Sequence, residues 1–143
     1  MNVAAILKTK GHEIVTVNQD ATLEMVAGTL AENRIGAVVV LGTRGDVAGI
    51  ISERDIVRMI ARDGASALLQ SAGSAMTRDV ATCGPGDTLD DVMELMTNGR
   101  FRHAPVIESD KLVGIISIGD VVKHHIAEVE LEASALKTYL VAG

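Results

Sequence analysis

The sequence predicts an α/β fold made of two tandem β-α-β-β-α units, each of about 60 residues. The main observation is a duplicated stretch, because residues 49–57 (GIISERDIV) return as residues 114–122 (GIISIGDVV). Each copy reads as a short apolar strand that runs directly into a helix. A second observation is the composition: 48% of the residues are apolar, yet there is one Phe, one Tyr and no Trp. We therefore expect aliphatic cores and, because each unit has one sheet face to bury, sheet-to-sheet packing with pseudo-twofold symmetry.

The duplication extends well beyond this stretch. Matching positions lie 66 residues apart before the second hairpin and 65 apart after it, because that hairpin is one residue shorter. Thr16 corresponds to Thr82, each expected near the end of the first strand of its unit. The other pairs include Thr22 with Thr88, Arg34 with Arg100, Val40 with Val106, Ser52 with Ser117, and Asp55 with Asp120.

Hydrophobic patterning predicts the first elements of the chain. Residues 3–7 read as a short helix closed by Gly11, and residues 14–17 read as a strand. A helix with one apolar face follows, since the apolar positions recur at helical spacing: Leu23, Val26, Ala27 and Leu30.

A hairpin and a second helix complete the first unit. Residues 37–41 and 47–51 read as its two strands, joined by the turn residues 42–46. Ser52 then begins a helix that ends near Arg62, with three side chains expected to face inward: Ile56, Met59 and Ile60.

The repeat sets the expected boundaries. The first repeat covers residues 11–63 and the second covers residues 76–126. Residues 64–75 between them are rich in Gly, Ser and Ala, which predicts a connector with one helical turn. Residues 127–143 form a helical extension beyond the second repeat.

An apolar seam runs through the last helix and past the end of the repeat. Its members follow a 4-3-4-3-4 spacing that is typical of a coiled coil: Val122, Ile126, Val129, Ala133, Leu136 and Leu140. Two interpretations remain open. The seam packs against a partner helix, which predicts a homodimer and is favoured here, or it folds back onto its own domain.

Charge and composition exclude several classes of function. The net charge of −6 argues against a general nucleic-acid binder. No stretch is long and apolar enough for a signal peptide or a membrane span. The single Cys83 excludes an intrachain disulfide and fits a reducing compartment. These features predict a cytoplasmic protein with no nucleic-acid or membrane partner. No arrangement typical of a catalyst or a metal site is discernible, so we do not expect an enzyme.

The strand-to-helix junction of each repeat carries the candidate chemistry. A helix start presents backbone N–H groups that attract anions such as phosphate, and an acid three residues after the junction serine can accept hydrogen bonds from hydroxyl groups. Ser-x-x-Asp is also a capping box, which needs no ligand. Residues 88–91 (TLDD) have the same spacing without the preceding strand. The spacing alone favours the capping interpretation. The occurrence of the junction in both repeats strengthens the ligand-binding interpretation.

The order of these motifs resembles the CBS-domain pair, also called a Bateman module, in its stand-alone bacterial form. The resemblance rests on the duplicated Gly-Ile-Ile-Ser-x-x-Asp, on residues 76–80 (MTRDV) and on residues 102–106 (RHAPV). It covers residues 11–126 and makes the whole chain, residues 1–143, a single module. It implies a regulatory and not a catalytic role.

The resemblance also implies a regulatory ligand that contains adenosine: AMP, ADP, ATP, an NAD-type dinucleotide or S-adenosylmethionine. No cofactor is required. Asp120 would hold the ribose hydroxyls, Ser117 would contact ribose or phosphate, and Thr82 would meet the adenine edge. Arg102 and His103 would face the phosphates, and Pro105 and Ile118 would complete the site. The matching places in the first repeat are those of Thr16, Ala37, Ser52 and Asp55, with Arg54 as an added cation.

The two copies differ in charge. The second has Arg102 and His103 where the first has Gly36 and Ala37, which favours the second as the stronger phosphate site, although Arg54 and Arg58 can compensate in the first. Three hypotheses stay open: an adenosine-ligand sensor acting through dimer or partner contacts, an interaction module with vestigial nucleotide sites, and an unrecognised catalyst on a bound nucleotide. The ligand and any target protein are not identified by the sequence.

Overall fold

The computed structural model describes residues 1–11 and 13–142. These residues form two compact units that do not follow the order of the chain. The repeat-1 unit comprises residues 13–80 and 110–112, and the repeat-2 unit comprises residues 1–11, 81–109 and 113–142. Residues 1–11 therefore pack with the second half of the sequence.

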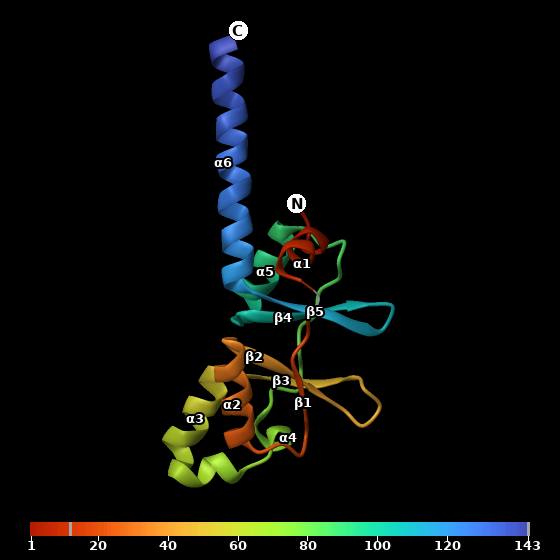
Figure 1. Cartoon of the computed structure of the whole chain (residues 1–143), viewed down its shortest axis with the longest axis vertical. Coiled ribbons are helices and arrows are strands. Elements are labelled where there is room, and N and C mark those ends of the chain that lie inside the picture. The colour runs from red at the N-terminus through yellow and green to blue at the C-terminus, as the bar shows by residue number, and fades with distance from the viewer. Residues whose placement is uncertain (12, 143) are drawn as a thin grey trace. The chain divides into compact units, whose positions relative to one another are not determined.

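The repeat-1 unit is built on a three-stranded sheet of order β1-β2-β3 (Figure 1). Strand β2 (Ala37–Leu41) lies parallel to β1 (Thr16–Asn18) and antiparallel to β3 (Val47–Ser52). Helix α2 (Leu23–Asn33) lies between β1 and β2 in the chain, and α3 (Glu53–Asp63) follows β3. This confirms the predicted order of elements and the predicted hairpin.

Strand β1 is shorter than predicted. Its register with β2 begins at the pair Thr16–Val39, so Ile14 and Val15 lie outside the strand. Thr16 therefore opens β1 instead of lying near its end, as the sequence had suggested.

Aliphatic side chains fill the core of the repeat-1 unit, and its α2 face is the predicted one, with Leu23, Val26 and Leu30 buried. On α3, Ile56 is buried and Met59 packs against the core. Ile60 is 40% exposed, contrary to the prediction. The stripe that α3 buries is narrow, and Ile60 lies on its flank.

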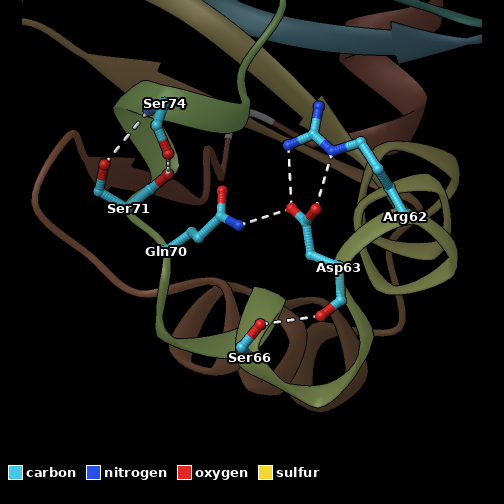
Figure 2. A network of polar contacts seen from close by, with 6 residues as sticks. All are labelled: Arg62, Asp63, Ser66, Gln70, Ser71 and Ser74. Carbon is cyan, nitrogen blue, oxygen red and sulfur yellow. Dashed lines mark hydrogen bonds and ion pairs between the residues drawn. The ribbon is translucent and has the colours of Figure 1, made fainter.

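The connector holds more structure than the predicted single helical turn. The 3-10 helix η1 (Gly64–Leu69) is followed by the short helix α4 (Ala72–Ala75), and each buries one alanine completely. Figure 2 shows the polar network around this segment, in which Asp63 accepts hydrogen bonds from Arg62 at 3.1 and 2.9 Å and from Gln70 at 2.8 Å. These hydrogen bonds lower the pKa of the Asp63 carboxyl. Small side chains let both short helices pack closely.

The repeat-2 unit contains a two-stranded sheet of β4 (His103–Glu108) and β5 (Lys111–Ser117). Helix α5 (Leu89–Gly99) precedes this hairpin and α6 (Ile118–Ala142) follows it. Helix α1 (Val3–Lys10), capped by Asn2 and followed by Gly11, completes the unit and confirms the predicted N-terminal helix.

The strand predicted to end near Thr82 is not formed. Within the described residues the counterpart of β1 is a single parallel bridge between Cys83 and Val106. The amide of Cys83 donates to the carbonyl of Pro105 at 3.0 Å, and the amide of Ile107 donates to the carbonyl of Cys83 at 2.8 Å. Residues 84–86 (GPG) follow at once, and proline and glycine disfavour a continued strand.

The core of the repeat-2 unit combines segments from both ends of the chain. Val3, Ile6 and Leu7 of α1 are buried together with side chains of α5, β4, β5 and α6. The core is again aliphatic, with Phe101 packed only at its edge.

The glycine of each duplicated stretch marks a close approach. A Cβ on Gly114 would lie 2.6 Å from the side chain of Leu7, and one on Gly49 would lie 2.6 Å from both Met76 Sδ and the carbonyl oxygen of Thr77. In each unit, the segment that precedes one repeat in the chain packs against the glycine-bearing strand of the other repeat. A side chain at either position would therefore require a neighbouring group to shift.

Helix α6 is one continuous helix of 25 residues. Val121 is buried, whereas the large seam residues are exposed, from 41% for Val122 to 68% for Leu140. Figure 1 shows the C-terminal half of α6 running clear of the other elements of its unit. The interpretation in which the seam folds back onto its own domain is therefore wrong for the described residues.

Candidate functional site

The two strand-to-helix junctions are built in the same way. In the first repeat the Asp55 carboxylate accepts from the Ser52 amide at 2.8 Å, and the Asp55 amide donates to Ser52 Oγ at 3.3 Å. In the second repeat the Asp120 carboxylate accepts from the Ser117 amide at 2.9 Å, and the Asp120 amide donates to Ser117 Oγ at 3.1 Å. Both are capping boxes, so the capping interpretation of the sequence is confirmed.

A third amide at each helix start is also occupied. The Glu53 amide donates to the carbonyl of Gly36 at 2.9 Å, and the Ile118 amide donates to the carbonyl of Arg102 at 2.7 Å. The sequence had suggested a set of free amides at this point. Three of the first four are bonded within the protein, so a bound anion would depend mainly on cationic side chains.

The carboxylates nevertheless keep accepting capacity. Every hydrogen bond that the described residues make to Asp55 or Asp120 goes to Oδ2. In each case Oδ1 faces no protein donor among these residues. The box formed by Thr88 and Asp91 at the start of α5 has the same pattern, so this geometry alone does not identify a ligand site.

Lys10 distinguishes the second junction from the first. Its ammonium donates to Asp120 Oδ2 at 2.7 Å and to the carbonyl of Ile115 at 2.9 Å. Burial of Asp120 disfavours its charged form, but the hydrogen bond from Lys10, the Ser117 amide and the Lys10 charge together lower the pKa of the Asp120 carboxyl. This contact could not be predicted from local sequence patterns, because Lys10 lies 110 residues from Asp120.

The remaining candidates of the second repeat lie on two neighbouring segments. Arg102 is exposed and its carbonyl holds the start of α6, while His103 opens β4 and is half-buried. Pro105 is buried and Thr82 is exposed, and each immediately precedes one residue of the parallel Cys83–Val106 bridge. The structure thus brings Ser117, Ile118, Asp120 and the backbone of Arg102 into direct contact.

Only part of the first-repeat set is brought together. Ala37 pairs with Ser52 across the hairpin, and the exposed Arg54 lies between Ser52 and Asp55 on α3. Thr16 pairs with Val39 on β2, the strand that also carries Ala37, and it lines a cavity of about 430 Å³ whose lining also includes Arg44, Asp46 and Lys111 but none of the other first-repeat candidates.

Comparison with known proteins identifies the family to which this chain belongs. The family model named CBS domain matches residues 4–62 and 72–126. The chain belongs to the CBS-domain family. In Arabidopsis thaliana, the mitochondrial CBS domain-containing protein CBSX3 is 32% identical over 149 residues, covering 99% of this chain and 72% of that protein.

Solved structures of CBS-domain proteins have the same fold as this chain. A CBS-domain containing protein from Agrobacterium tumefaciens has 50% identity and a TM-score of 0.85, covering 87% of this chain and 99% of that chain. The CBS domain pair of protein MJ0100, crystallised with 5′-methylthioadenosine and S-adenosyl-L-methionine, has 22% identity and a TM-score of 0.80, covering 90% of this chain and 98% of that chain. This last likeness concerns the fold.

A metal centre and a reactive thiol are two other kinds of site that side chains of the CBS repeats could form. Within the described residues no three or more His, Cys, Asp or Glu side chains are grouped so that they could hold a metal ion. Burial, with the charge of Asp87, raises the pKa of the Cys83 thiol to about 11. A thiol with this pKa is a poor nucleophile.

Among the described residues, no helix is long and apolar enough to cross a membrane.

Proposed function

We propose that this CBS pair is a non-catalytic regulatory module that binds an adenosine-containing ligand and passes the ligand state on through contacts with a second copy or a target protein. The candidates are AMP, ADP, ATP, an NAD-type dinucleotide and S-adenosylmethionine. The CBS repeats support the regulatory class. The MJ0100 pair, which holds two adenosine compounds on the same fold, supports the ligand class.

The observation that carries the proposal is the duplicated junction. In each repeat an apolar strand runs directly into a helix whose first turn holds an aspartate, fixed by a capping box through Oδ2. No donor among the described residues bonds Oδ1, which leaves it available to a ligand hydroxyl. A ribose offers two adjacent hydroxyls of this kind. The predicted neighbours add polar and cationic groups, with Arg54 in the first repeat and Arg102 and His103 in the second.

An interaction module with vestigial sites is the second candidate, because the exposed seam of α6 is a further surface that the described residues leave uncovered. A helix of this kind leaves an apolar stripe that a second α6 could bury, as in a coiled coil. The homodimer is therefore part of both proposals, and ligand binding separates them.

Thermal unfolding with a panel of adenosine ligands tests the proposal. A ligand at a hundred times its dissociation constant stabilises the folded state by about 2.7 kcal/mol. We expect an increase in melting temperature with at least one ligand and no turnover of that ligand by chromatography. The absence of both a shift at millimolar concentration and calorimetric binding favours the interaction module, and consumption of the ligand would identify a catalyst.

A further inference from the structure

We propose that Lys10 makes the Asp120 site selective for anionic adenosine ligands; this rests on the proposed function. In the free protein the Lys10 ammonium is paired with Asp120. When ribose hydroxyls bind Asp120 Oδ1, the ammonium on the neighbouring Oδ2 gains the ligand's phosphate as an additional acceptor.

Helix α1 fixes the position of this ammonium. Lys10 is the last residue of α1, which is anchored by the buried Val3, Ile6 and Leu7. From there Nζ reaches Asp120 Oδ2 at 2.7 Å and the Ile115 carbonyl at 2.9 Å, both next to the start of α6. The Lys10 and Asp120 side chains are 36% and 25% exposed. Partial removal from water makes such a contact stronger than an ion pair in open solvent.

Among the described residues, the first repeat has no such cation in the matching place. The carbonyl of Ile50, the counterpart of Ile115, accepts the backbone amide of Thr77 at 3.0 Å. The Asp55 carboxylate accepts only from Ser52 among the described residues. The two repeats therefore differ in the charge that surrounds an otherwise similar junction.

This difference has a consequence for the ligand. A neutral nucleoside that engages Asp120 Oδ1 leaves the ammonium on Oδ2 and offers it no further strong acceptor. A phosphate offers several charged oxygen acceptors to the same ammonium. The sulfonium of S-adenosylmethionine would add a second positive charge beside Lys10. The Asp120 site should thus prefer AMP over adenosine and over S-adenosylmethionine.

Site-resolved NMR tests this on the full 15.0 kDa chain. The Ser117 amide, bonded to Asp120, reports the second junction, and the Ser52 amide, bonded to Asp55, reports the first. AMP and adenosine are titrated into the wild type, Lys10→Met and Lys10→Arg. Lys8→Met is the matched control, because Lys8 is exposed on the same helix and its replacement changes the net charge equally.

At the Ser117 amide we expect Lys10→Met to reduce the preference for AMP over adenosine by about tenfold, the scale of one charged hydrogen bond. Lys10→Arg should retain the preference, and Lys8→Met and the Ser52 amide should show no change. An unchanged preference in Lys10→Met, with binding intact, overturns the role of Lys10 alone. Failure of both ligands to move either amide in any variant overturns the selectivity proposal, and a thermal panel that is also negative for the other candidate ligands overturns the proposed function as well.

Discussion

At the scale of single residues, the two junction aspartates form equivalent capping boxes but stand beside different charges. Asp120 accepts a hydrogen bond from Lys10, and the Arg102–His103 pair is predicted to add charge at the same site, whereas Asp55 has Arg54 next to it in the chain. Charge, and not cap geometry, is therefore the property that should separate the two sites.

Replacement of each aspartate by alanine tests this ranking. We expect Asp120→Ala to weaken nucleotide binding more than Asp55→Ala, with a loss of about 1.5–3 kcal/mol for a charged acceptor. Calorimetry gives the affinities, and the unfolding of both ligand-free variants controls for the lost cap. A larger loss of affinity in Asp55→Ala would reverse the ranking of the sites.

The Lys10 contact also predicts a pH dependence without any ligand. Because the folded state lowers the pKa of Asp120, this carboxylate contributes stability above its unfolded pKa of about 3.9, and the contribution is lost as the pH falls through the lower folded value. Lys10→Met should move the titration of Asp120 to higher pH. Carboxyl-carbon NMR measures it, and Asp91 is the internal control, since its pKa is lowered mainly by the backbone amide of Thr88. Equal titration of Asp120 in both proteins would show that the ion pair does not persist in solution.

At the scale of elements, the close approaches at Gly49 and Gly114 differ in what they meet. The atoms opposite Gly114 belong to the Leu7 side chain, which has some room to move, whereas Gly49 also faces the backbone carbonyl of Thr77. That carbonyl is held by a 3.0 Å hydrogen bond from the Ile50 amide. Backbone in a bridge cannot yield as a side chain can.

We therefore expect Gly49→Ala to destabilise the protein more than Gly114→Ala, whose cost should be about 1–3 kcal/mol, as is typical of overpacking. Urea unfolding measures both. Gly28→Ala in α2 is the control, because an added Cβ there meets nothing within 4 Å, and it should be neutral or stabilising. Similar losses at Gly49 and Gly114 would mean that the bridge at Thr77 yields as easily as a side chain.

The elements also show what the sequence could and could not supply. The helices and hairpins followed from periodicity, and the caps followed from Ser and Asp three residues apart, because these signals are local. The contact of Lys10 with Asp120 joins residues 110 apart and depends on where α1 packs. No strand forms at Thr82, because the pairing there is limited to a single bridge at Cys83. The match with Thr16, which does lie in a strand, had suggested otherwise. The bonding of the Glu53 and Ile118 amides could not be predicted either, because it depends on where the hairpin places the carbonyls of Gly36 and Arg102.

At the scale of the whole molecule, the exposed seam of α6 predicts assembly with a second copy of the chain. Its large apolar residues are exposed, and burying each one stabilises a complex by about 1.5–3 kcal/mol. We expect the full chain to be a homodimer and truncation after Ala127 to weaken or abolish it. Light scattering at several concentrations measures this.

Two results would count against this assembly. A truncated protein that dimerises as tightly as the full chain would show that the seam is not an important part of the interface. A full-length monomer would exclude the homodimer altogether.

The exchange of segments between the units bears on how this protein can be divided. A fragment cut at the boundaries of the second repeat, residues 76–126, lacks α1 and with it the buried Val3, Ile6 and Leu7. A fragment limited to residues 11–63 lacks Ala72 and Met76, which are buried in the core of the repeat-1 unit. Neither copy of the duplication carries its own complete interior. A swap of one repeat between relatives must therefore carry along the segment that completes its core.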